Sequence, residues 1–331
     1  IVHPNDDINM SQSSNDVIPT AIRLAAIHDL MELFENGENL RKILLKKSKE
    51  FGDYLKVGRT HLQDAVPITL GQEFGAYSFA LEKCLKRIKY AAEELKILGI
   101  GGTATGSGIN TGDKFAKMMC EQLEILCEEK GLSAAENKFE TTHSMAVFLA
   151  ISAALRGLAV ELLRISNDIR MMASGPVAGL NEIILPEVEP GSSIMPGKVN
   201  PSIPECLSMI CIQVIGLDQS ISLAAQQGQF ELNWHTPLIM FDLLHQIEIL
   251  KNGMRMFAEN CISGIRADKK ALEEKLNAST ALATVLAPHI GYKVVAKLVK
   301  ESLKKGIPFA KVVPAKYKKF LDPKLMIKPN R

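Results

Sequence analysis

The chain has 331 residues, of which 47% are apolar and 23% are charged. This length and apolar content allow a sizeable buried core in one or a few domains, and they exclude a wholly disordered chain. The 39 Lys and Arg residues against 37 Asp and Glu leave a formal charge of +2, which argues against a nucleic-acid binder, because such a protein needs a clustered basic excess.

Proline placement predicts long helices. Proline is absent between Pro67 and Pro176 and between Pro237 and Pro288, and a proline in a helix interior costs about 3 kcal/mol. Apolar spacing predicts helices over 17–51 (with Asn15 or Asp16 as N-cap), 67–98, 137–173 (interrupted at Gly157), 202–225, 237–260, 268–285 and 292–304. Only residues 181–188 have an extended pattern. The sequence therefore predicts an all-α fold, with a central long-helix bundle domain over 1–260 and a small C-terminal helical domain over 261–331.

The predicted helices are too long and too apolar for an isolated protomer. A helix of about 35 residues is about 50 Å long at 1.5 Å per residue. The stretch from Val147 to Leu163 is apolar on more than one face, and such a helix needs neighbours on all sides. We therefore predict a bundle whose core is completed by other copies of the chain in a symmetric homo-oligomer.

Cysteine usage indicates the compartment. The six cysteines form no CxxC pair and no zinc-like cluster with histidine; they are Cys84, Cys120, Cys127, Cys206, Cys211 and Cys261. Dispersed in apolar runs, they are typical of reduced core residues, so we expect a cytoplasmic protein without a metal site. The sequence has no uncharged apolar stretch of 18 residues, so we expect no membrane partner. No basic and then apolar leader opens the chain, so we expect no secretion signal. Because the chain begins at Ile1 rather than at Met, we expect that it lacks the first part of a longer protein, and that residues beyond 331 are missing too.

Two glycine-rich stretches superficially match nucleotide-binding motifs. The stretch from Gly99 to Ala104 fits G-x-G-x-x-A but follows a predicted helix, whereas the fingerprint must follow a strand, so we expect a glycine-rich turn. The stretch from Gly191 to Lys198 has one residue too many between its glycines, and Val199 replaces the Ser or Thr of a P-loop. We therefore predict no nucleotide cofactor.

Three polar segments carry the candidate chemistry. Residues 3–16 (HPNDDINMSQSSND) gather small hydrogen-bonding side chains at a predicted helix start, which favours anions; an ordinary N-cap is the alternative. Residues 58–67 (GRTHLQDAVP) place His61 in a turn between two helices, either as a proton donor or acceptor near neutral pH or as a surface residue. In residues 191–201 (GSSIMPGKVNP), glycines and prolines bracket hydroxyls, a cation and an amide. This composition suits a loop that closes over an anion, the alternative being an inert connector.

The third segment resembles the signature of the fumarase/aspartase superfamily. Further segments resemble class II fumarases in the same order: VHPNDDINMSQSSND, GRTHLQDAVPITLGQEF, GIGGTATGSGIN, ENKFE and ENCISGI. The resemblance spans residues 1–304. It implies an all-α, L-aspartase-like fold, a homotetramer with a long central helical core, and active sites shared between subunits that act on a small dicarboxylate without cofactor or metal. The family's upstream Ser/Thr-rich substrate loop has no counterpart in this sequence.

The resemblance also implies roles for single residues. Ser192 matches the general base, acting as an alkoxide, and His61 matches a catalytic histidine that the carboxylate of Glu205 orients and charges. Lys198 and Asn200 match groups that hold the carboxylate into which charge flows as a carbanion forms. The substrate-binding positions are Ser13, Ser14, Asn15, Thr60, Ser193, Lys198, Val199 and Asn200, and a secondary anion site comprises His3, Asn5 and Asp6. Asp7 departs from the pattern, since family members often carry His there, and it adds negative charge beside that anion site.

Members of the superfamily add H–X across fumarate, and X distinguishes them. Fumarases tend to have SQSSND and GGTA, as this chain does at Ser14 and Gly102, whereas aspartases tend to have SQSTND and GATA. GLNEI at 179–183 and IPE at 203–205 also occur in aspartase-like sequences. We therefore predict the reversible hydration of fumarate to (S)-malate. Aspartate ammonia-lyase is the first alternative, and a catalytically silent structural homotetramer is an alternative of another class.

Overall fold

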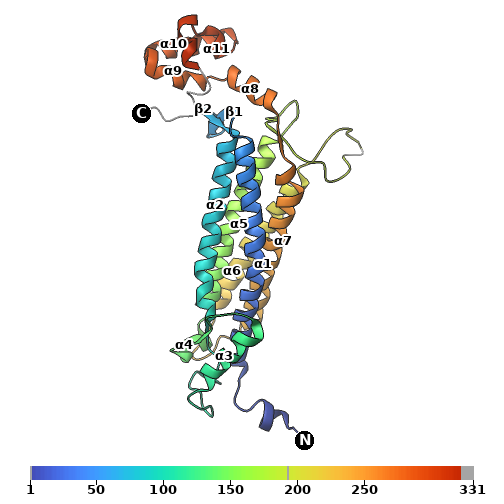
Figure 1. Cartoon of the computed structure of the whole chain (residues 1–331), viewed down its shortest axis with the longest axis vertical. Coiled ribbons are helices and arrows are strands. Elements are labelled where there is room, and N and C mark those ends of the chain that lie inside the picture. The colour runs from blue at the N-terminus through green and yellow to red at the C-terminus, as the bar shows by residue number, and fades with distance from the viewer. Residues whose placement is uncertain (1, 192–193, 322–331) are drawn as a thin grey trace. The chain divides into compact units, whose positions relative to one another are not determined.

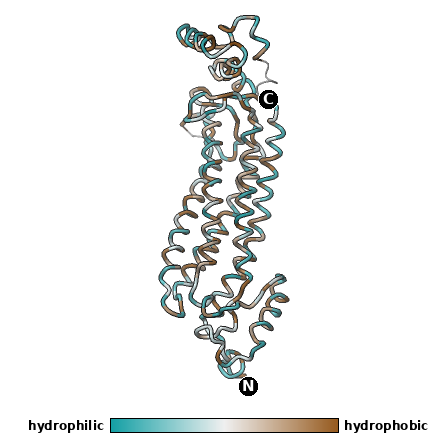
Figure 2. The backbone as a smooth tube through the Cα atoms, turned by 90° about the vertical axis from the view of Figure 1, so that its left-hand side faces the viewer, coloured by the Kyte–Doolittle hydropathy of each residue, from teal (hydrophilic) through white to brown (hydrophobic). Residues whose placement is uncertain are grey.

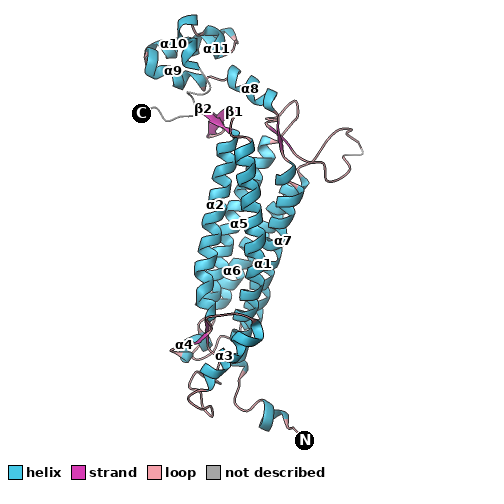
Figure 3. Ribbon diagram, viewed as in Figure 1, coloured by secondary structure: helices cyan, strands magenta, loops and turns pink. Residues whose placement is uncertain are grey.

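The computed structural model of the chain describes residues 2–191 and 194–321. Helices dominate it and the strands are short (Figure 3), so the predicted all-α class is confirmed. Two compact units can be distinguished. Unit 1 comprises Ile1–Leu40, Ala80–Ser166 and Ile203–Phe257, and unit 2 comprises Arg41–Phe79, Asn167–Ser202 and Ala258–Arg331. The predicted domain boundary near residue 260 stays a prediction.

The α-helices are α1 Ser14–Glu50, α2 Leu70–Ala92, α3 Phe115–Cys127, α4 Lys138–His143, α5 Ala146–Met172, α6 Ser202–Ala225, α7 Thr236–Asn260, α8 Lys269–Ala278, α9 Leu282–Ile290, α10 Tyr292–Lys305 and α11 Phe309–Val312. The strands are β1 Leu55–Thr60, β2 Gln63–Thr69, β3 Ile97–Leu98, β4 Ser133–Ala134, β5 Ile183–Ile184 and β6 Arg266–Ala267. Short segments of π- or 3₁₀-helix lie at Pro4–Ile8, Glu93–Lys96, Ile262–Gly264 and Ala315–Leu321.

Unit 1 contains a bundle in which segments of α1, α2, α5, α6 and α7 lie side by side (Figures 1 and 2). Buried polar contacts join neighbouring helices: Ser152 donates to Asp218 at 2.7 Å, Gln246 donates to the Val214 carbonyl at 3.0 Å, and Lys251 pairs with Glu32 at 2.9 Å. Asp218 is also paired with Arg156 at 3.0 Å. These contacts help to fix how the helices pack against each other.

Large apolar side chains remain uncovered on this bundle. Met209 and Ile212 on α6 are 65% and 60% exposed, and Phe241 on α7 is 65% exposed. By length and hydropathy alone α5 and α6 qualify as membrane-spanning helices, a test that the core helices of bundle proteins also pass. The exposure agrees with the expectation that such helices need neighbours beyond one chain.

Unit 2 has a small apolar core of its own, built on the C-terminal helices. Val57 of β1 packs in it with Leu282 and Leu286 of α9, Val295 of α10 and Phe309 of α11. The short strands β5 and β6 pair antiparallel in the same unit, with Ile183 opposite Ala267. The C-terminal helices therefore contact the strand that leads toward residues 60 and 61.

Several elements differ from the sequence-based expectations. The helix expected over 137–173 is two helices, α4 and α5, separated at residues 144–145, and Gly157 lies inside α5 without interrupting it. The helix expected to begin at 67 begins at Leu70, because residues 63–69 form β2, and α3 had no predicted counterpart. The N-cap of α1 is Ser13 rather than Asn15 or Asp16, since the Asn15 N–H donates to Ser13 Oγ at 3.1 Å and the Ser13 N–H donates to Asp16 Oδ1 at 3.0 Å.

Candidate active site

The first candidate segment is fixed by one buried carboxylate. Asp16 is only 1% exposed, and besides the Ser13 N–H it accepts the N–H groups of Gly101 at 2.9 Å and Thr103 at 3.0 Å. The neighbouring Asn15 side chain donates to the Ala104 carbonyl at 2.7 Å. The predicted binding residues Ser13, Ser14 and Asn15 therefore lie together on a helix start that cannot fray independently of the glycine-rich loop.

The glycine-rich loop is a turn, as expected. Gly101, Thr103, Gly106 and Gly108 all have positive φ angles, which explains the density of glycines. The loop follows the two-residue strand β3 rather than a helix directly, yet its N–H groups serve the carboxylate of Asp16. Sequence reasoning missed Asp16, which it treated only as an alternative N-cap. A signal was present in Ser13-x-x-Asp16, a spacing typical of a capping box.

The predicted secondary anion site lies on an exposed turn. His3 Nδ1 is 3.1 Å from Asp6 Oδ2 and accepts the N–H of Asn5 at 3.3 Å. Asp7, the residue that departs from the family pattern, accepts the backbone N–H of His3 at 2.7 Å. The structure thus brings His3, Asn5 and Asp6 together but surrounds His3 with carboxylates, and anion binding there stays a prediction.

The second candidate segment is a β-hairpin, not a simple turn between helices. β1 and β2 pair antiparallel with Thr60 opposite Gln63, so His61 and Leu62 form a two-residue connection. Both have left-handed backbones, with φ of 54° and 59°, as a type I′ turn requires. Asn and Gly are the residues that this turn prefers. The turn residues His61 and Leu62 therefore have a strained backbone. The side chains of Thr60 and His61 at the tip of the hairpin are exposed to solvent.

Buried charges support this hairpin from inside unit 2. Lys56 Nζ lies 2.6 Å from Glu73 Oε2 and 2.7 Å from Glu182 Oε2, and Arg59 Nη1 lies 2.7 Å from Glu182 Oε1. Burial raises the pKa of the Glu73 carboxyl above its ordinary value, and this effect outweighs the opposing attraction of Lys56. Sequence reasoning missed these residues, because Lys56, Glu73 and Glu182 lie in different elements and share no spacing signal.

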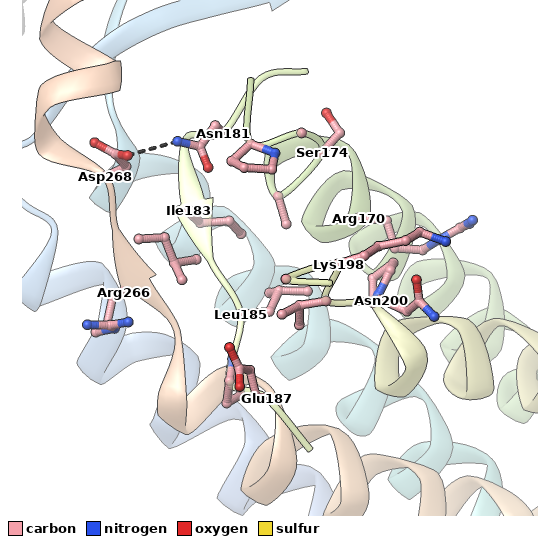
Figure 4. Close-up of a pocket in the computed structure, with 18 residues that line it drawn as sticks. Arg170, Ser174, Asn181, Ile183, Leu185, Glu187, Lys198, Asn200, Arg266 and Asp268 are labelled. Carbon is pink, nitrogen blue, oxygen red and sulfur yellow. Dashed lines mark hydrogen bonds between the residues drawn. The ribbon is translucent and has the colours of Figure 1, made fainter. Parts of the chain in front are cut away.

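The third candidate segment, which we call the strap (residues 191–201), borders a pocket of about 830 Å³. Ser192 and Ser193 lie outside the described residues. Lys198 and Asn200 line the pocket beside Arg170, and Figure 4 shows these three on one side, with Arg266 and Asp268 on the other. Val199 lines the pocket as well.

The charge around the pocket and the glycines of the strap both suit an anion. The lining holds the cations Arg170, Lys198 and Arg266 against the carboxylates of Glu187 and Asp268. Asp268 is already engaged, because it accepts from Asn181 Nδ2 at 2.8 Å and caps α8. Gly191 allows the start of the strap to approach Lys198 closely, since a Cβ there would lie 2.8 Å from the Lys198 carbonyl oxygen.

The predicted residues therefore form separate groups. Lys198, Val199 and Asn200 share one pocket in unit 2, and Thr60 and His61 share the hairpin tip of the same unit. Ser13, Ser14 and Asn15 belong to unit 1, as does Glu205 in the first turn of α6. The pairing of His61 with Glu205 stays a prediction.

Comparisons with known proteins agree with one another. A family model described as lyase matches residues 1–216. Fumarate hydratase class II 2 of Bradyrhizobium diazoefficiens is 43% identical over 99% of this chain and 71% of its own length. The crystal structure of recombinant class II fumarase from Schistosoma mansoni superposes with a TM-score of 0.94 at 37% identity, over 100% of this chain and 74% of that one. An aspartate ammonia-lyase of Bacillus subtilis is 43% identical over 92% of this chain and 64% of its own length.

Proposed function

The chain belongs to the fumarase/aspartase superfamily of lyases, and from that premise we propose that it is a fumarate hydratase, which interconverts fumarate and (S)-malate. The observation that carries this proposal is the identity of about four residues in ten to class II fumarate hydratases over nearly the whole chain. The L-aspartase-like fold is shared with solved class II fumarases.

We infer that the three candidate segments act on a dicarboxylate in a homotetramer whose active sites are shared between subunits. Ser192 is the base that takes the proton from malate, and Lys198 and Asn200 hold the carboxylate that gains charge as the carbanion forms. A fixed cation and amide at that carboxylate stabilise the transition state more than the substrate, because the extra charge exists only there. The cationic lining around Lys198 supports this assignment.

The remaining residues complete the proposed site. Ser13, Ser14 and Asn15 bind the other carboxylate and the departing group, and Thr60 and Ser193 add contacts to the substrate. His61, oriented by Glu205, serves the departing hydroxyl as acid or base near neutral pH. The assignment of Ser13, Ser14 and Asn15 is supported by the anchoring of their helix start through Asp16. Binding residues that are already fixed orient the substrate, so less entropy is lost in reaching the transition state.

A direct assay tests the proposed reaction. The purified protein is incubated with (S)-malate and, separately, with aspartate, and fumarate is followed by its ultraviolet absorbance without added cofactor. We expect fumarate from malate. Fumarate from aspartate alone would identify an aspartate ammonia-lyase instead, the alternative that the Bacillus subtilis relative favours. Silence with both substrates would favour the structural alternative.

A further inference from the structure

Four charged side chains in unit 2, two of them buried and two partly buried, take no part in the proposed chemistry. Glu182 and Lys56 have side chains that are 1% and 2% exposed, and Arg59 and Glu73 are 17% and 23% exposed. The contacts of 2.6–2.7 Å run in one chain from Glu73 through Lys56 and Glu182 to Arg59. Two cations and two carboxylates balance, and removal of the Glu182 charge leaves Arg59 without this partner and Lys56 with Glu73 alone.

Glu182 joins the strand of the hairpin to the segment that leads into the strap. Its backbone is held on both sides, because its N–H donates to the Met172 carbonyl at 2.8 Å and its carbonyl accepts the Asp268 N–H at 3.0 Å. Its side chain reaches Lys56 and Arg59 of β1. Directly after Glu182 the chain runs through β5 into the strap.

The hairpin tip needs such an anchor. Arg59 immediately precedes Thr60 and His61, and the left-handed backbones of His61 and Leu62 are unfavourable for residues other than glycine. Strained conformations of this kind persist only where the flanking structure holds them in place. The flanking strand is held at Lys56 and Arg59, both by the same carboxylate.

We propose that Glu182 is a positioning residue, which clamps the strand that carries Thr60 and His61 to the base of the strap. The proposal rests on the proposed function, because it assigns importance to His61 and the strap. Glu182 does not touch the substrate. It sets the direction of the hairpin tip, and a displacement of about 1 Å in a catalytic group can cost about 100-fold in rate.

The test compares Glu182→Gln with a matched control. Asp218→Asn is the control, since Asp218 is likewise a buried carboxylate paired with an arginine and a hydrogen-bond donor, but in unit 1. For both variants and the wild type we would measure kcat and KM for malate, the melting temperature, and hydrogen exchange of peptides covering β1–β2. Exchange reports on the hairpin whether or not the protein is active.

For Glu182→Gln we expect kcat to fall about 10-fold or more, a smaller change in KM, and faster exchange in residues 55–69. The double variant Glu182→Gln/Lys56→Met should lose little more kcat than Glu182→Gln alone, because both act through one clamp. Asp218→Asn should lower the melting temperature while leaving kcat and hairpin exchange close to wild type.

Three results would overturn the proposal: a folded Glu182→Gln protein with wild-type kcat and hairpin exchange, an equal loss of kcat in Asp218→Asn, or fully additive losses in the double variant. If Glu182→Gln does not fold, Arg59→Gln replaces it, because that change leaves both Lys56 pairs intact; unchanged exchange and kcat there would also overturn the proposal. A wild type that is inactive on malate would refute the proposed function alone, and hairpin exchange would still decide the role of Glu182.

Discussion

At the scale of the residue, Asp16 shows how one side chain joins two distant segments. It accepts three backbone N–H groups, two of them from the loop at Gly101 and Thr103. Thr103 adopts a left-handed backbone with φ of 57° in this arrangement. The carboxylate therefore holds the substrate-binding start of α1 and also stabilises an unfavourable loop conformation.

We predict that Asp16→Asn destabilises the protein by about 2–4 kcal/mol, because an amide offers one acceptor oxygen and places an NH₂ group against an N–H donor. Urea unfolding measures the change. Asp113→Asn, an exposed carboxyl near the same loop, serves as control and should shift stability by no more than about 0.5 kcal/mol. Equal stability of the two variants would contradict the assigned role of Asp16.

At the scale of the element, the hairpin of β1 and β2 explains what sequence reasoning could and could not find. The long helices α6 and α7 were predicted nearly to the residue, because proline spacing and apolar periodicity act locally. The hairpin was missed because its turn is His-Leu rather than Asn-Gly, and because Lys56 interrupts the apolar pattern of β1 although it is buried. Lys56 is stabilised there by Glu73 and Glu182, and residues so distant in sequence leave no local signal.

The turn itself gives a prediction. Leu62 is 67% exposed and has φ of 59°, so the free-energy cost of its left-handed backbone is not offset by burial of its side chain. Leu62→Gly should raise the stability of the protein by about 1 kcal/mol, seen as a higher melting temperature. Leu126→Gly, at a similarly exposed leucine within the helix α3, should instead lower it by about 1 kcal/mol. A loss of stability in Leu62→Gly would contradict the strained-turn interpretation.

The raised pKa of Glu73 gives a second prediction at this scale. As pH rises from the ordinary value of 4.5 toward the raised one, the unfolded chain releases its proton first, so the native state binds more protons and stability falls with pH. Glu73→Gln removes this contribution. The free energy of unfolding of the wild type, minus that of the variant, should therefore decline from about pH 4 upward and level off above the raised pKa, as urea titrations at several pH values would show. A difference that grows with pH across this window would mean that the pKa is lowered instead.

At the scale of the whole molecule, the proposed sharing of sites between subunits can be tested by mixing. Ser192→Ala and His61→Asn should each lower kcat by orders of magnitude while leaving the assembly intact. If Ser192 and His61 of one site come from different chains, co-refolding the two inactive variants should restore part of the activity, because some mixed sites receive both intact residues. Refolding each variant alone is the control. Persistent inactivity of the mixture would place both residues of a site on one chain.

The exposed side chains of Met209, Ile212 and Phe241 affect the assembly of the protein in solution. A newly synthesised protomer, before it assembles, exposes this apolar surface to water, where it can associate nonspecifically with other chains. Whether the protomer stays folded and soluble then depends on how quickly it assembles with other copies of the chain. Dilution should therefore lower the apparent stability of the protein, because the stabilisation that comes from assembly depends on protomer concentration.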